Sequence, residues 1–383
     1  MAAQTHSTLY FGPWYRKSPY FEATQRHGCT AFDIYNHTYL PAYYDDPVKE
    51  YRHLLEHVTL WDVGAEHIVQ IAGPDAQAFT NMLTCRDLTR CQVGQCKYAP
   101  LIAPDGGIVN DPVLLRIADD TFWLALADSD AGLWARAIAW RSGMDVQITE
   151  PEVYPVQVQG PKAKDVIGDL FGQDVLDIRY YWCREAELDG IPLVLGRTGW
   201  TGEIGFEVYL RDPGRGDELW ERIMDAGRPY EIRPIAPCEP RRIEAGIFNY
   251  GSDMTLENNP FEVTGLERLV EEQEADYLGK ESLERLRSDG VSRKLVGMEM
   301  DGDPMGWELT EFWPAFLDGQ RVGHVTTMVW SPRLERNIGY VWVPIDLAEP
   351  GTEIQVEPAP GSMRPARTAA LPFLDPRKRI PAA

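Results

Sequence analysis

Residues 98–130 read YAPLIAPDGGIVNDPVLLRIADDTFWLALADSD, and this stretch predicts three antiparallel strands. The first strand ends near Ala103, the second covers Ile108–Ile117 and the third covers Phe122–Ala127. Asp-Gly and Gly-Gly in the first turn are strong hairpin signals, because glycine supplies the positive φ that a tight turn requires. Residues 118–121, Ala-Asp-Asp-Thr, form the second turn. We expect the rest of the chain to be organised around these strands.

Asp111 is the only charge on one face of the predicted middle strand. Side chains alternate between the two faces of a strand, so Asp111 shares its face with Val109, Val113, Leu115 and Ile117. A lone carboxylate on an apolar face is unfavourable unless it is paired or put to use. Asp111 is therefore the first candidate for a functional residue.

Bulk composition indicates a globular protein that does not bind nucleic acid. The 383 residues suffice for two or three domains, with 44% hydrophobic and 25% charged residues. A net charge of −22 argues against a nucleic acid or an anionic membrane surface as partner. No window has the roughly 18 uninterrupted apolar residues of a membrane span. The N-terminal stretch MAAQTHSTLYFGPWYRK lacks a secretory signal, and the six cysteines form no Cys-x-x-Cys pair, so we expect a cytoplasmic protein with reduced thiols.

The sequence offers only weak metal-binding patterns. His53 and His57 lie four residues apart on a helix that Asp46-Pro47 is expected to open. The glutamate of a zinc protease is missing from its required place and no third ligand is evident, so a solvated helix face is the favoured interpretation. We predict no metal site. A zinc site usually has four ligands, and no fourth ligand accompanies the three thiols of Cys85, Cys91 and Cys96. We interpret these cysteines as core residues or as residues without a specific role.

A strand followed by Gly-Pro-x-Ala and a helix occurs twice, at residues 70–76 and 157–163. Two related α+β halves that face each other would form a natural cleft. From Lys294 the pattern changes to short strands with turns, which predicts a small C-terminal β-domain. We therefore expect a first region at residues 1–290, made of two interleaved α+β domains, and a β-domain at residues 291–383.

A glycine-rich loop at residues 196–205 precedes a further predicted strand. Its four glycines allow close approach of backbone to a ligand. It is not a phosphate loop, because the Gly-Lys-Ser/Thr ending is absent and a strand follows instead of a helix. On that strand Gly205, Glu207 and Tyr209 face one way, and spacing alone favours an exposed sheet face for Glu207.

Taken together, these motifs resemble the folate-dependent aminomethyltransferase family, whose founding member is the glycine-cleavage T-protein. Any single motif is weak, whereas seven in the same order across about residues 30–375 are specific. Phrases such as YNHTYLP, HVTLWDV and MLTCRDL are similar to the branch that demethylates dimethylsulfoniopropionate. At one position the chain departs from that branch: it has Gly202-Glu203 where the branch has Lys-Gln. Gly202-Glu203 is similar to the T-protein sequence at this position. The identity of the methyl donor is therefore left open. The matching pieces are WDV at Trp61–Val63, GGIVND at Gly106–Asp111, RTGWTGEIGFE at Arg197–Glu207, RIEAG at Arg242–Gly246, YGSDM at Tyr250–Met254, NPFE at Asn259–Glu262 and SP at Ser331-Pro332.

The resemblance implies an α+β fold, with two related α+β domains plus a C-terminal β-barrel-like domain around a central site for tetrahydrofolate. Residues 1–290 would then be the folate-binding catalytic region. Asp111 matches the family's essential aspartate beside the pterin ring. Glu207 matches the glutamate that binds the pterin edge, which reverses the preference for an exposed sheet face. The other predicted cofactor-binding residues are Trp200, Tyr98 and Arg242.

The implied activity is transfer of a methyl group from dimethylsulfoniopropionate, or a related onium or methylamine donor, to N-5 of tetrahydrofolate in one-carbon metabolism. Alignment of donor and nucleophile can contribute ~7–11 kcal/mol to such a displacement. A desolvated Asp111 carboxylate can stabilise the developing positive charge and then accept the proton. Aromatic faces bind onium groups, although core packing is the alternative for each candidate. The candidates for contact with the donor are Tyr35, Trp61 and Trp182.

Two alternative functions remain open from the sequence. One is a glycine-cleavage-type aminomethyltransferase. The other is a non-catalytic folate-binding protein, because the same fold serves iron–sulfur assembly factors. Those factors carry a Lys-Gly-Cys-Tyr signature, whereas this chain has Arg197–Trp200 without the cysteine, which favours an enzyme. The expected partner is a small-molecule methyl donor, with no nucleic acid and no membrane, and assembly as a homodimer is left open.

Overall fold

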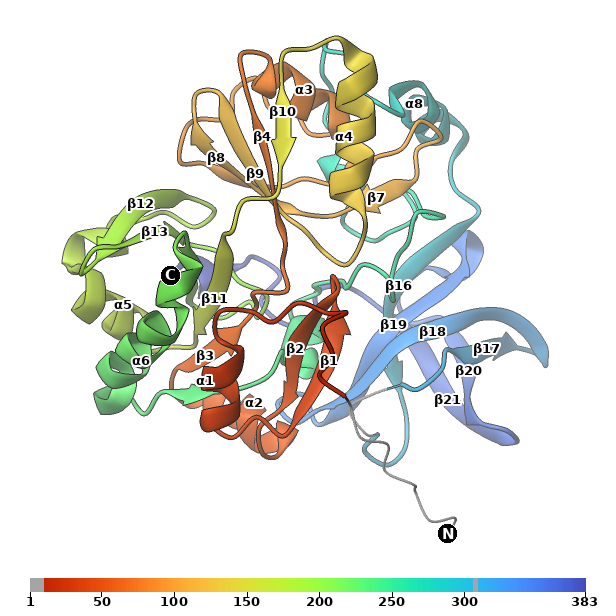
Figure 1. Ribbon diagram of the computed structural model, residues 1–383. Coiled ribbons are helices and arrows are strands. Elements are labelled where there is room, and N and C mark those ends of the chain that lie inside the picture. The colour runs from red at the N-terminus through yellow and green to blue at the C-terminus, as the bar shows by residue number, and fades with distance from the viewer. Residues whose placement is uncertain (1–9, 306–308) are drawn as a thin grey trace.

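The computed structural model describes residues 10–305 and 309–383, which form two β-sheets with covering helices and a closed β-barrel (Figure 1). This arrangement confirms the expected α+β fold with a C-terminal barrel. Residues 1–9, part of the stretch expected to lack a secretory signal, lie outside the described residues. Within the described ranges, no helix has the length and apolar character needed to cross a membrane.

The first sheet has five strands in the order β10-β4-β9-β8-β5, and two helices cover one of its faces (Figure 1). Phe79 and Leu83 of the first of these helices pack against Leu114 and Leu124 of the sheet. The elements are β4 (Ile68–Ala72), α3 (Ala76–Leu83), β5 (Cys96–Tyr98), β8 (Val113–Ala118), β9 (Thr121–Ala125), α4 (Ala131–Ser142) and β10 (Gln147–Thr149). A separate two-stranded hairpin joins β6 (Leu101–Ile102) to β7 (Ile108–Asn110).

The predicted middle strand, Ile108–Ile117, is interrupted at Asp111-Pro112. β7 pairs with β6, whereas β8 pairs with β9 and β5. Pro112 has no backbone N–H to donate to a ladder, so regular pairing cannot continue through it. The prediction that Asp111 lies on the face of one continuous strand is therefore wrong. Asp111 stands instead at a break between two ladders, while both predicted turns occur where the sequence places them.

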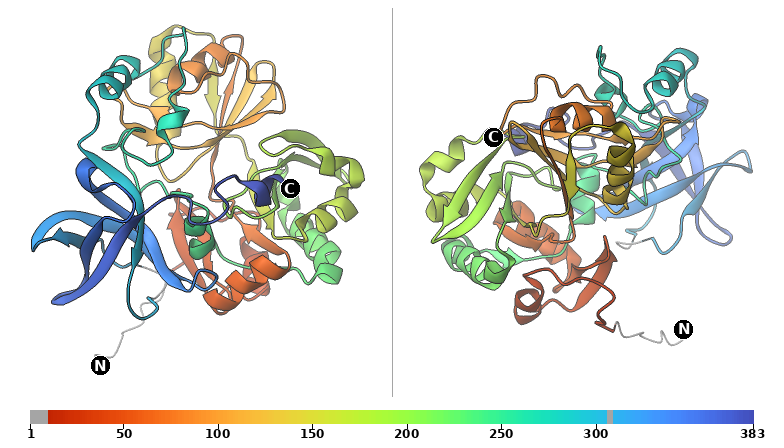
Figure 2. Two further views of the ribbon diagram at one scale, coloured as in Figure 1. Left: turned by 180° about the vertical axis from the view of Figure 1, so that it is seen from behind. Right: turned by 45° about the horizontal axis from the view of Figure 1, so that its top comes forward.

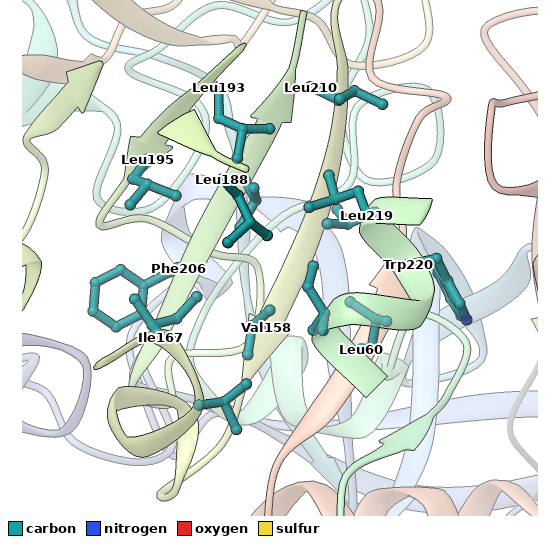
Figure 3. Packing of buried hydrophobic residues seen from close by; sticks show 14 of the residues in the cluster. Leu60, Val158, Ile167, Leu188, Leu193, Leu195, Phe206, Leu210, Leu219 and Trp220 are labelled. Atoms are coloured by element: carbon teal, nitrogen blue, oxygen red, sulfur yellow. The ribbon is translucent and has the colours of Figure 1, made fainter. Parts of the chain in front are cut away.

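The second sheet has six strands in the order β12-β13-β14-β11-β3-β15. Figure 3 shows Leu195 and Phe206 of this sheet beside Ile167, and Leu219 and Trp220 on a helix over the same face. Phe206 therefore faces the core, as the alternation predicts. The elements are β3 (Thr59–Asp62), β11 (Tyr154–Gln159), α5 (Ala163–Phe171), β12 (Cys183–Leu188), β13 (Ile191–Gly196), β14 (Gly205–Leu210), α6 (Gly216–Gly227) and β15 (Arg233–Pro234).

The two Gly-Pro units form the same local structure in the two sheets. Each joins a strand to a helix, β4 to α3 and β11 to α5, through a glycine with positive φ. Gly73 has φ +135° and Gly160 has φ +126°. A Cβ atom on Gly73 would lie 2.5 Å from the Asp145 carbonyl oxygen, and one on Gly160 would lie 2.5 Å from the His57 carbonyl oxygen. Glycine is therefore required at both positions for the same two reasons.

The other faces of the two sheets pack against each other. Ile68, Leu115 and Trp123 from the first sheet share a buried cluster with Val194 and Tyr209 from the second. The two sheets are also interleaved along the chain, because β3 pairs with β11 although the whole first sheet lies between them in sequence. The facing sheets thus surround a common interior.

An N-terminal segment packs below the sheets and a barrel lies beside them (Figure 1). The segment consists of α1 (Phe21–Arg26), β1 (Ala31–Tyr35), β2 (Thr38–Tyr43) and α2 (Pro47–Glu56). Asp46 caps α2 by accepting from Val48 N and Lys49 N. The chain's end runs from the barrel back to the second sheet (Figure 2). The remaining elements are α7 (Glu239–Glu244), α8 (Lys280–Asp289), β16 (Arg293–Met300), β17 (Trp313–Leu317), β18 (Gln320–Ser331), β19 (Arg336–Pro344), β20 (Glu353–Ala359), β21 (Ser362–Ala369) and α9 (Arg379–Ala382).

The interpretation of His53 and His57 as a solvated helix face is wrong. His53 is 8% exposed, and its Nε2 lies 2.6 Å from the Glu231 carbonyl oxygen. The two imidazole rings stack with centroids 4.6 Å apart, and burial lowers the pKa of His53. This face of α2 is covered by the turn that holds Glu231, a tertiary contact that the helical spacing does not reveal.

Gly160→Ala is expected to lower stability more than Gly190→Ala. Both glycines have positive φ, +126° and +79°, which costs an L-residue about 1 kcal/mol, but only the new methyl group at Gly160 meets backbone. That clash should add roughly 1–3 kcal/mol. Urea denaturation of the two variants measures the difference. Equal midpoints would contradict the close approach of Gly160 to His57.

Candidate functional site

A cavity of about 530 Å³ lies where the facing sheets meet the glycine-rich loop and the segments 246–250 and 264–269. This volume is in the range of pockets that bury a small ligand. Val113 of the first sheet and Gln157 and Glu207 of the second line it, and Asp111 lines it from the break before β8. The cavity therefore brings together the two carboxylates that the sequence singles out.

Asp111 reaches this cavity from the break between β7 and β8. The Tyr98 hydroxyl donates to Asp111 Oδ2 at 2.7 Å. Burial raises the pKa of Asp111 to about 7, and the hydrogen bond from Tyr98 opposes that rise. The carboxyl thus changes protonation close to neutral pH, the property of a group that accepts a proton during a reaction.

Glu207 lies on β14 and is 3% exposed, so an exposed sheet face is excluded. Gln157 Nε2 donates to its Oε1 at 2.8 Å, and the Tyr209 hydroxyl donates to its Oε2 at 2.6 Å. The Thr198 hydroxyl donates to the same Oε2. Burial raises the pKa of Glu207, and these three donors oppose the rise. The network fixes the carboxyl while leaving it at the cavity wall.

Four predicted aromatic residues line the cavities. Tyr98, Trp200 and Tyr35 line the large cavity. Trp61 lines a smaller cavity of about 190 Å³, together with Tyr35 and Trp200. The Trp61 Nε1 donates to Thr59 Oγ1 at 2.8 Å, which satisfies its polar atom and fixes the ring.

The large and small cavities share five lining residues: Tyr35, Glu66, Gln157, Trp200 and Asn249. We call this set the junction. Because the junction walls both spaces, molecules bound in the two cavities would meet there. The arrangement suits a reaction between two ligands that enter from different sides.

Two predicted site residues line neither cavity. Trp182 packs at the margin of the core of the second sheet, with the Arg179 guanidinium 3.9 Å from its ring centroid. Arg242 is 1% exposed and forms ion pairs with Glu239 at 2.6 Å and Asp253 at 2.8 Å. Its guanidinium lies 5.2 Å from the Trp200 ring centroid, so it acts on the cavity through Trp200.

Sequence reasoning missed Glu66 and Gln157 at the junction. Gln157 lies opposite Glu207 on β14 and opposite Trp61 on β3. The second Gly-Pro motif marks the strand that carries Gln157. A prediction that this strand pairs with the strand of Glu207 would have placed Gln157 in the site. Glu66 follows β3 in a short connection, where no periodic pattern distinguishes it from a surface residue.

Basic residues line another part of the large cavity. Arg268 and Lys378 are close enough that Arg268 contributes to lowering the pKa of Lys378, which burial lowers most, to about 8. The Lys378 Nζ donates to the Ala245 carbonyl oxygen at 2.7 Å. Arg268 has no ion pair with any described residue. These two cations suit a ligand that ends in carboxylates.

Among residues 10–305 and 309–383, no group of three or more His, Cys, Asp or Glu is placed to hold a metal ion. The cysteines of the predicted core are free thiols and buried, in agreement with that interpretation.

Comparison with known proteins relates the chain to one family along most of its length. Residues 20–274 match the GCVT N-terminal domain, and residues 293–375 match the glycine cleavage T-protein C-terminal barrel domain. The chain is 36% identical to dimethylsulfoniopropionate demethylase of Ruegeria pomeroyi over 91% of this chain and 95% of that protein. It is 30% identical to an aminomethyltransferase of Desulfitobacterium hafniense, over 89% and 93%. The crystal structure of glycine cleavage system aminomethyltransferase T from Bartonella henselae superposes with a TM-score of 0.84 at 25% identity, covering 94% of this chain and 98% of that one.

Arg242→Met is expected to lower the free energy of unfolding by about 3–5 kcal/mol, because it leaves the buried Asp253 carboxylate without its partner. Arg184→Met is the matched control, since it breaks the exposed pair with Asp174, worth about 0–1 kcal/mol. Chemical denaturation measures both. A loss for Arg242→Met no larger than for the control would exclude a structural role for this ion pair.

Proposed function

The chain belongs to the glycine-cleavage T-protein family, and we propose on this premise that it moves a methyl group from dimethylsulfoniopropionate, or a related onium or methylamine compound, to N-5 of tetrahydrofolate. It is a methyl-transferring enzyme of a folate-dependent family. The observation that carries the choice of donor class is the 36% identity to the demethylase over 91% of this chain.

The large cavity has the groups that tetrahydrofolate requires. Glu207 offers a fixed carboxylate to the donor edge of a pterin, held in place by Gln157, Thr198 and Tyr209. Trp200 offers an aromatic face in the same cavity. Arg268 and Lys378 suit the carboxylates of the glutamate tail. When bound, tetrahydrofolate supplies N-5 as the methyl acceptor.

Asp111 is the residue that we assign to proton and charge handling. As a carboxylate it stabilises positive charge that develops at the acceptor nitrogen, and it then holds the released proton. Tyr98 keeps the carboxyl in place by its hydrogen bond to Oδ2. Because the Asp111 carboxyl is buried, this interaction is stronger than it would be in water.

An aminomethyltransferase is the second candidate, favoured by one local observation. Glu203, which matches the T-protein pattern, pairs with Arg241 at 2.7 Å. The protein should be incubated with tetrahydrofolate and each of dimethylsulfoniopropionate, glycine betaine, dimethylglycine and an aminomethyl-lipoyl carrier. Formation of 5-methyltetrahydrofolate from an onium or methylamine donor supports the proposal. Formation of 5,10-methylenetetrahydrofolate from the carrier alone would replace it with the second candidate.

Asp111→Asn should retain folate binding but lose turnover by on the order of 10²-fold or more, because it removes the charge without changing the shape. In the unmodified protein, turnover should fall as pH drops below about 7, since the raised pKa of Asp111 leaves it protonated there. Initial rates across pH test both statements. Turnover near the unmodified level in Asp111→Asn would contradict the assigned role.

Lys378→Gln should weaken tetrahydrofolate binding at pH 7 by about 3- to 30-fold, the loss of a charge-assisted hydrogen bond. Because the Lys378 pKa is lowered to about 8, its charge is present below that pH and lost above it. Affinity of the unmodified protein should therefore fall as pH rises through 8. Titration with tetrahydrofolate and with a tetrahydropterin that lacks the tail measures this.

Lys49→Gln is the control for Lys378→Gln, since Lys49 is exposed and pairs with Asp45. The tetrahydropterin without the tail should bind the unmodified protein, Lys378→Gln and Lys49→Gln with equal affinity. An equal loss for both ligands in Lys378→Gln would place its effect on the pterin end or on the fold.

A further inference from the structure

We infer that the small cavity is the subsite for the cationic centre of the methyl donor, and that Glu66 at the junction is its counter-charge. This inference rests on the proposed function and adds the residue that selects the donor by charge. It depends on three features of the structure: a carboxyl without a partner, an amide oxygen without a donor, and an unequal distribution of charge between the two cavities.

Glu66 differs from the other two carboxyls of the cavity wall. Asp111 accepts from Tyr98, and Glu207 accepts from three donors. The Glu66 side chain has no hydrogen bond or ion pair with any residue in the described part of the chain, although it lines both cavities. A carboxyl withdrawn from bulk water without a partner is unfavourable, so its partner is expected to be a ligand.

Gln157 provides a second, independent observation at the same place. It is fully buried, and its Nε2 is committed to Glu207 at 2.8 Å. Its Oε1 has no hydrogen-bond partner and belongs to a side chain that lines both cavities. The junction thus holds two acceptor groups, a carboxyl and an amide oxygen, without donors among the described residues. A positively charged centre would satisfy both electrostatically.

Charge is distributed unequally between the two cavities. Among the described residues, the small cavity is lined by three acids and by no Lys, Arg or His. Of these acids, Glu239 is already paired with Arg242 at 2.6 Å, and Asp33 is exposed to solvent. Glu66 is the unpaired one. The large cavity carries Arg268 and Lys378 instead, so an anionic tail and a cationic donor are drawn to different spaces.

Aromatic rings complete the subsite. Trp61, Trp200 and Tyr35 line the small cavity, and ring faces attract a sulfonium or quaternary ammonium group. Trp61 is held by its bond to Thr59 and is fully buried, so its ring position is fixed. A carboxylate beside fixed aromatic faces recognises an onium group without any hydrogen bond from the ligand, which a sulfonium cannot donate.

The titration of Glu66 provides a signature of this binding. Burial raises its pKa well above the usual value, and repulsion by Glu207 adds to the rise. The titratable groups that face it are Glu207, Tyr35 and Tyr209, and none of them can carry positive charge. These surroundings therefore favour the protonated carboxyl, whereas a bound cation favours the carboxylate. Binding of an onium ligand should release a proton.

Glu66 should act on donor affinity more than on the rate of the chemical step. It interacts with charge that the donor already carries in the ground state, so its loss raises KM and changes kcat little. Methyl transfer from a sulfonium leaves a neutral thioether, which Glu66 no longer attracts. The residue would thus separate substrate from product by charge.

The test is calorimetric titration of the full chain, without tetrahydrofolate so that no turnover occurs. The probes are dimethylsulfoniopropionate and 4-methylpentanoate, in which a neutral carbon replaces the sulfonium sulfur. The unmodified protein should bind the sulfonium on the order of 10- to 100-fold more tightly. Glu66→Gln should bind both probes about equally and release no proton, and Glu66→Asp should keep part of the preference. Glu152→Gln, a change of an exposed acid, should behave as the unmodified protein.

Steady-state kinetics separates this inference from the proposed function. If the unmodified protein transfers no methyl group from any donor, the proposed function fails, while the titrations still decide the role of Glu66. If transfer occurs and Glu66→Gln keeps both the charge preference and the KM of the unmodified protein, the inference fails and the function stands. Glu66→Gln should unfold at the same or a higher temperature, since it removes an unpaired buried acid, and this shows that the variant is folded.

Discussion

Carboxyl groups enclosed between two β-sheets set the strongest constraint on this structure. The sheets face each other through Trp123 and Tyr209, and the space beside that contact holds Asp111, Glu207 and Glu66. Each of these groups is far more stable in water as an anion, so each needs donors, a proton or a ligand. The polar network of Tyr98, Gln157, Thr198 and Tyr209 around two of them follows from that need. The third is left for a ligand.

The same constraint separates what the sequence could predict from what it could not. Asp111 and Glu207 were predictable because each is an acid within a strand pattern or motif, although Pro112 breaks the strand that was to carry Asp111. The hairpins, both Gly-Pro units and the barrel follow from local signals of turn chemistry and alternation. Glu66 lies in a short connection, and Lys378 lies near the C-terminus, far in sequence from the other residues of the cavity. Their roles depend on tertiary neighbours that no local pattern encodes.

Burial also explains the residues whose sequence interpretation changed. His53 has the spacing of a helix surface, yet the turn at Glu231 covers it. Arg242 lies within a family motif, but its guanidinium is used by Asp253 and Glu239, and it supports Trp200 from behind. Trp182 is stacked by Arg179 at the margin of a hydrophobic core. In each case the residue type indicated which interactions the side chain can form. Tertiary packing determined which residue it contacts.

The interleaved order of strands has a consequence for how the protein is made. β3 is synthesised early, but its neighbours β11 and β15 are completed only after Gln159 and Pro234. A nascent chain therefore carries β3 with unpaired edges while the first sheet emerges, and exposed edges favour wrong association. The closing contacts of the second sheet are distant in sequence and consequently slow to form. An isolated N-terminal half of the chain would have no finished cavity, because Glu207, Arg268 and Lys378 are made only later.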